Sequence, residues 1–128
     1  MYKLSKRSLD NLEGVDIVLI DIIKEAIKTS PFDFGIPSTG GLRTAEEQNA
    51  LYLKALSKCD GYNNKSYHQS GKAFDVYGYV DGRATWDKVI LTKIARHIQN
   101  IAYDVFCVEL KWGGDWVNFK DYPHFEIR

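Results

Sequence analysis

The 128-residue sequence has little cysteine and no net charge, and each shortage excludes a class of protein. Cys59 and Cys107 could in principle pair, but the sequence shows no secretory signal, and their spacing matches no zinc motif. We expect both to be free, buried thiols. Seventeen basic residues balance seventeen acidic ones, so no overall field draws the chain to nucleic acid or to an anionic membrane.

Long hydrophobic runs are also missing. No apolar run follows the basic start at residues 1–7, and the apolar segment 12–23 is interrupted by charged residues such as Glu13 and Asp16. We therefore expect neither a signal peptide nor a transmembrane helix, and a protein made in the cytoplasm that needs another route to leave it. The length and the 45% hydrophobic content predict one globular domain over residues 1–128.

Periodic apolar residues and capping signals predict three helices. The first covers residues 15–27, where apolar side chains recur at i, i+3, i+4 and i+7, and Pro31 ends it. The third covers about residues 86–103, and we expect Trp86 at its start to belong to its buried stripe. The second begins with a capping box of Thr44 and Glu47. We expect the second helix to bury its apolar side chains, Leu51, Tyr52, Ala55 and Leu56.

Alternation of apolar and polar residues predicts short strands over residues 73–80, 106–112 and 124–127, with a turn at residues 81–82. Residues 31–41 are rich in proline, glycine, serine and threonine and predict a loop with one short strand. Because the late strands follow one another closely, we predict an α+β fold in which a small antiparallel sheet packs with about three helices.

Two short segments carry residues that can bind a metal ion. The segment Ser-Tyr-His-Gln-Ser-Gly-Lys-Ala-Phe-Asp supplies His68 and Asp75, and the segment Asp-Tyr-Pro-His supplies Asp121 and His124. Two imidazoles and one carboxylate are a sufficient set of protein ligands for a catalytic Zn²⁺, which keeps its fourth position for water. The remaining carboxylate can take a proton from that water. The sequence therefore predicts a zinc hydrolase.

Two other interpretations of the histidines compete with this one. A hydrolytic triad of Ser66, His68 and Asp75 can be drawn, but a serine and a histidine two residues apart on a loop seldom align, and the triad leaves His124 unused. We expect His97 to be structural, because it lies in the middle of a predicted helix with no acidic partner at ligand spacing.

The two motifs resemble those of the peptidase M15 family, zinc peptidases that act on bacterial cell-wall peptides. The resemblance rests on Ser-x-His-x-x-Gly-x-Ala-x-Asp at residues 66–75 and on Pro-His-Phe-Glu at residues 123–126. It extends upstream, where residues 5–9 and 41–48 are similar to the short endolysin-type members. It covers most of the chain and implies a D-Ala-D-Ala-peptidase/Hedgehog-like zinc domain.

The resemblance also implies a metal site and a base. His68, Asp75 and His124 match the zinc ligands of the family. Asp121 matches the acidic residue that serves as general base shortly before the last histidine, where some members carry glutamate. Asp115 is a second candidate for the base, farther from the ligand.

Four further residues are candidates for the same site. Arg43 matches a family arginine near the substrate and the developing oxyanion. We expect Ser66 to be structural or to donate a hydrogen bond to the substrate, and Trp116 to form a wall of the cleft. Because His124 and Glu126 share one face of their predicted strand, Glu126 is expected either to hold an imidazole or to be solvated.

The function implied is a peptidoglycan hydrolase of the endolysin type. It would cleave the L-alanyl-D-glutamate bond of stem peptides as a monomer, after its release from the (host) cytoplasm to the cell wall. A D,D-carboxypeptidase or dipeptidase of the same family is an alternative, and it needs a second basic residue in the cleft, for which the sequence offers no clear candidate. A non-catalytic, zinc-stabilised binding domain is the other, and an intact Asp121 argues against it.

Overall fold

The computed structural model describes residues 1–128. Its four helices are α1 (Lys6–Asn11), α2 (Ile17–Thr29), α3 (Ala45–Leu53) and α4 (Lys88–Phe106). Its six strands are β1 (Asp33–Gly35), β2 (Ala73–Asp75), β3 (Tyr77–Val80), β4 (Arg83–Thr85), β5 (Lys111–Trp112) and β6 (His124–Glu126). Two 3₁₀ turns are η1 (Tyr67–Ser70) and η2 (Gly113–Asp115). None of the helices combines the length and the apolar character that crossing a membrane requires.

The strands form two antiparallel sheets where we predicted one, and the α+β class is confirmed. The first sheet has the order β1-β3-β4 and the second the order β2-β6-β5. The strand predicted over residues 73–80 is divided at Val76 into β2 and β3, which belong to different sheets. The strand predicted over residues 106–112 is reduced to β5, because α4 extends to Phe106 and ends where Cys107 adopts a φ of 56°.

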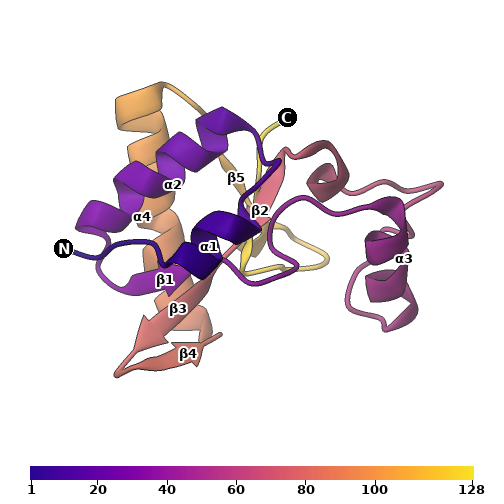
Figure 1. Ribbon diagram of the computed structural model, residues 1–128, viewed down its shortest axis with the longest axis horizontal. Coiled ribbons are helices and arrows are strands. Elements are labelled where there is room, and N and C mark those ends of the chain that lie inside the picture. The colour runs from indigo at the N-terminus through magenta and orange to yellow at the C-terminus, as the bar shows by residue number, and fades with distance from the viewer.

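The helices α2 and α4 pack side by side and form the main core with the sheets (Figure 1). His97 of α4 lies 2.9 Å from the carbonyl oxygen of Ala26 and 3.0 Å from the hydroxyl of Thr29, so its expected structural role is confirmed. The prediction that Trp86 begins the buried stripe is wrong. Asp87 caps α4 one residue later, and Trp86 is 52% exposed.

Helix α3 stands apart from the α2–α4 pair (Figure 1). The capping box is confirmed, because Thr44 Oγ1 accepts a hydrogen bond from the Glu47 amide and Glu47 Oε1 accepts one from the Thr44 amide. The prediction that this helix buries an apolar face is wrong, since the side chains of Tyr52 and Leu53 are 45% and 74% exposed. Gln48 is the buried residue of α3, so a polar side chain anchors the helix.

None of the four residues that we expected this helix to bury is buried. Leu51 is half-buried, and Tyr52, Ala55 and Leu56 are exposed. The two cysteines are free, as predicted. Cys59 is half-buried, and Cys107 is exposed because it caps the end of α4. The expectation that both thiols are buried is therefore wrong, because Cys107 is exposed and Cys59 is only half-buried.

The pairing of β2 with β6 places the core on one face and the candidate site on the other. Phe74 lies opposite Phe125, and their stacked rings are 4.8 Å apart in the core. Asp75 lies opposite His124, and directly opposed residues of an antiparallel pair point to the same face. A slip of one residue would exchange the two faces, so the apolar pair specifies the register that brings Asp75 and His124 together.

Candidate metal centre

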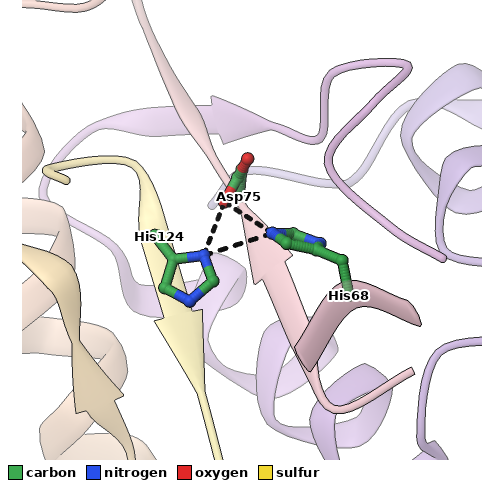
Figure 2. A group of neighbouring side chains, drawn as sticks. All are labelled: His68, Asp75 and His124. Atoms are coloured by element: carbon green, nitrogen blue, oxygen red, sulfur yellow. Dashed lines mark hydrogen bonds and ion pairs between the residues drawn. The ribbon is translucent and has the colours of Figure 1, made fainter. Parts of the chain in front are cut away.

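The side chains of His68, Asp75 and His124 converge from η1, β2 and β6 (Figure 2). Asp75 Oδ1 is 3.2 Å from both His68 Nε2 and His124 Nδ1, and these two nitrogens are 3.1 Å apart. A tetrahedral ion with ligand bonds of about 2.0 Å separates its ligand atoms by about 3.3 Å. The three donor atoms are therefore spaced like three corners of such a tetrahedron.

Outer partners fix which nitrogen of each imidazole faces the centre. His68 Nδ1 lies 2.9 Å from the carbonyl oxygen of Gly41, and His124 Nε2 lies 2.8 Å from Glu126 Oε1. Both oxygens are acceptors, so the ring nitrogens beside them carry the protons. With neutral rings, two nitrogen lone pairs and a carboxylate oxygen then face one another, which is an arrangement that a cation stabilises.

The site attracts positive charge. Burial lowers the pKa of His124, but its hydrogen bonds with Asp75 and Glu126 outweigh burial and raise that pKa to about 9. Burial raises the pKa of Asp75, but the charge of His68 and the hydrogen bonds with both histidines hold it well below its usual range. The Asp75 carboxylate therefore favours a positive charge beside it, which either a protonated His124 or a metal ion supplies.

Arg43 holds the second oxygen of Asp75. Its Nη2 donates to Asp75 Oδ2 at 3.0 Å, its Nη1 donates to Gln48 Oε1 at 3.0 Å, and its Nε donates to the carbonyl oxygen of Thr39 at 2.7 Å. The guanidinium thus uses three of its five N–H groups inside the protein. Two N–H groups have no partner within the protein, and Arg43 is among the residues that line the cleft.

The centre opens into a cleft. Most of the residues that line it come from the segments 57–68 and 116–128. Trp116 is one of them, and its ring is centred 5.2 Å from that of His124. Trp112, by contrast, is buried in the core.

Asp121 lines the cleft, and its carboxylate makes no hydrogen bond or ion pair within the protein. Burial raises the pKa of this carboxyl, and the charge of Asp75 raises it further. The Asp121 amide donates to the carbonyl oxygen of Gly113 at 3.0 Å. A Cβ on Gly113 would lie 2.9 Å from Asp121 Cβ, so only glycine permits this approach. Asp115, the alternative base, lies outside this cleft and is paired with Arg96 at 2.8 and 3.0 Å.

Ser66 borders the cleft but supports the fold of η1. Its Oγ accepts a hydrogen bond from the His68 amide at 3.2 Å. Both imidazole nitrogens of His68 have other partners, so the alternative triad of Ser66, His68 and Asp75 is not formed. Gly71, with a φ of 73°, then ends η1 and turns the chain toward β2.

Sequence reasoning missed several residues of the cleft or its support, among them Gln48, Lys58, Lys65 and Arg128. Gln48 carried one signal, because it lies in the segment 41–48 that resembles the endolysin-type members. The three basic residues carried none. Their spacing is that of ordinary solvated charges, and only the folded chain brings the segment 57–66 and Arg128, after β6, to the same cleft.

Comparisons with known proteins identify the class. The family model described as phage L-alanyl-D-glutamate peptidase matches residues 1–128. The chain is 30% identical over 122 residues to the peptidoglycan L-alanyl-D-glutamate endopeptidase CwlK of Bacillus subtilis, covering 84% of this chain and 68% of that protein. It is 29% identical over 129 residues to the L-alanyl-D-glutamate peptidase of Escherichia phage T5, covering 99% of this chain and 90% of that protein.

A solved structure agrees with the sequence relatives. The L-Ala D-Glu endopeptidase ChiX of Serratia marcescens has a TM-score of 0.86 and 28% identity, covering 99% of this chain and 90% of that one. The chain is therefore a peptidase with the α+β fold of such enzymes. It belongs to the phage L-alanyl-D-glutamate peptidase family, and the predicted resemblance to endolysin-type peptidases is confirmed.

Proposed function

We propose that this protein is a zinc-dependent endopeptidase that hydrolyses the L-alanyl-D-glutamate bond of peptidoglycan stem peptides, with residues 1–128 as one catalytic domain. The observation that carries the proposal is the floor of the cleft. Three donor atoms lie there at tetrahedral spacing, and an unpartnered carboxylate lines the same cleft. Membership of the peptidase family supports the choice of bond.

His68, Asp75 and His124 would hold the ion. Two imidazoles and one carboxylate suit Zn²⁺, and the tautomers set by Gly41 and Glu126 present the correct nitrogens to it. When bound, the ion supplies the Lewis acidity that activates a water molecule and polarises the scissile carbonyl group. Asp75 keeps one oxygen for the ion while Arg43 holds the other.

Asp121 acts as the general base. It takes a proton from the attacking water and delivers it to the amine of D-glutamate as the amide bond breaks. Arg43 keeps Asp75 oriented, and its remaining N–H groups donate to the oxyanion that develops on the carbonyl oxygen. Trp116 forms a flat wall for the peptide, and Ser66 contacts the substrate while it caps the turn that carries His68.

The substrate and the place of action follow from the reaction. Peptidoglycan is the partner of the protein, which acts on the cell wall as a monomer after release from the cytoplasm in which it is made. The neutral overall charge is consistent with a ligand other than nucleic acid or an anionic membrane.

The test is mass spectrometry of purified peptidoglycan digested with the zinc-loaded protein. We expect new L-alanine carboxyl termini and new D-glutamate amines, which disappear with a chelator and return with added zinc. Free D-alanine with an intact L-alanyl bond would indicate the carboxypeptidase alternative. A zinc-loaded protein that binds peptidoglycan and releases nothing would indicate the non-catalytic binding domain.

A further inference from the structure

The cleft is basic although the chain as a whole is neutral. The residues that line it include four basic side chains, Arg43, Lys58, Lys65 and Arg128, and two acidic ones, Asp121 and Glu126, while Asp75 on the floor is paired with Arg43. The full chain has seventeen of each sign. Positive charge is thus concentrated at this cleft, which favours a ligand with negative charge.

Two of the four cations have no anionic partner within the protein. Arg43 is buried and uses three N–H groups inside the protein, and the Nε of Arg128 donates to a glutamate carboxylate at 2.8 Å. Lys58 and Lys65 form no ion pair. The Lys58 ammonium lies over the Phe119 ring, 4.9 Å from its centre, and both residues line the cleft.

Both lysines belong to a loop whose backbone is held in place. This rim loop, residues 57–66, is tied by Gln48 Nε2, which donates to the Cys59 carbonyl, and by Gln69 Nε2, which donates to the Gly61 carbonyl, both at 2.9 Å. Inside the loop, Asp60 Oδ1 accepts three backbone amides at 2.9 Å. Because the backbone is fixed, binding an anion orders only the ends of the lysine side chains.

The proposed substrate carries a matching anion. A D-glutamyl residue within a peptide uses its amine and one carboxyl group in amide bonds, so its other carboxylate stays free close to the scissile bond. We infer that Lys58 and Lys65 bind this free carboxylate on the amine side of the scissile bond and thereby select a glutamyl residue over a neutral one. This inference rests on the proposed function.

The experiment uses two peptides that contain the L-alanyl-D-glutamyl bond and differ only in whether the free carboxylate is retained or converted to a carboxamide. For the zinc-loaded protein, we expect kcat/KM to be about 10- to 100-fold higher for the carboxylate, the range of a hydrogen bond to a charged group. In the Lys58→Ala/Lys65→Ala double variant, we expect this ratio to fall to near one, because kcat/KM falls chiefly for the carboxylate peptide. Each single variant should lose part of the ratio.

Lys54→Ala is the matched control. Lys54 is an exposed lysine at the end of α3, three residues before the rim loop, and it does not line the cleft. It should keep the wild-type ratio, and thermal melting checks that every variant is folded. The inference is overturned if the double variant keeps the wild-type ratio or loses activity equally on both peptides. A wild-type protein that cleaves neither peptide at the L-alanyl bond would overturn the proposed function and this inference together, so the two failures are distinguishable.

Discussion

The floor of the cleft and its rim are built in opposite ways. On the floor, His68, Asp75 and His124 are largely buried, and each is held by a second protein group. On the rim, the backbone of residues 57–66 is fixed while Lys58 extends into the cleft without an ion pair. The side chains of the floor are therefore held from several sides, whereas Lys58 on the rim is held through its backbone and has no anionic partner.

The largest expected effect comes from removing a floor ligand. His68→Ala and His124→Ala should each lose the bound zinc and all measurable hydrolysis of peptidoglycan, because two ligands do not hold the ion against solvent. Metal analysis and the digestion assay measure both effects. His97→Ala is the control, since this histidine bonds α4 to α2 away from the cleft, and it should retain zinc and activity. Full zinc content in both ligand variants would refute the metal centre.

Removal of the base should separate chemistry from metal binding. Asp121→Asn is expected to lower kcat by about 10²- to 10⁴-fold while zinc stays bound, because the amide cannot accept the proton of the attacking water. Kinetics on a stem peptide and metal analysis of the same sample test this. Asp115→Asn is the matched control, because its carboxylate pairs with Arg96 outside the cleft, and it should stay active. The reverse pattern would mean that Asp115 is the base.

A smaller effect is expected from Glu126, which contacts the ligand His124 and is not itself a ligand. Glu126→Gln should weaken zinc binding by about 10- to 100-fold, because a neutral amide orients His124 less strongly than a carboxylate at 2.8 Å. Competition with a chelator of known affinity measures the change. Glu109→Gln, which removes an exposed carboxylate paired with Lys111, serves as the control. Equal zinc affinity in both variants would show that Glu126 does not support the ligand.

The smallest expected effect concerns the link between floor and rim. Gln48 is buried and bonds Arg43 beneath the floor and the Cys59 carbonyl in the rim loop. Gln48→Ala leaves these groups unpaired, so we expect the free energy of unfolding to fall by about 1–3 kcal/mol in urea titrations. Asn49→Ala loses one bond, to the carbonyl oxygen of Asp60, and should cost less. If the two variants are equally stable, floor and rim are not linked through Gln48.

The sequence by itself determined the elements that depend on local patterns. The apolar period predicted α2 and α4, the capping box predicted the start of α3, and the two histidine motifs predicted which side chains meet. These predictions succeeded because periodicity and capping act over one or two helical turns, and because the motifs resemble those of a known family. The roles of Asp121 and Arg43 remain predictions that the variants above can test.

Only the tertiary structure decided how distant segments meet. It left α3 exposed, divided the predicted strand at Val76 between two sheets, and turned Arg43 toward Asp75. It also brought the lysines of the rim loop to a cleft whose floor is formed by η1, β2 and β6. These outcomes depend on contacts between residues far apart in the chain. A local sequence pattern does not predict which surfaces become buried when those residues pack together.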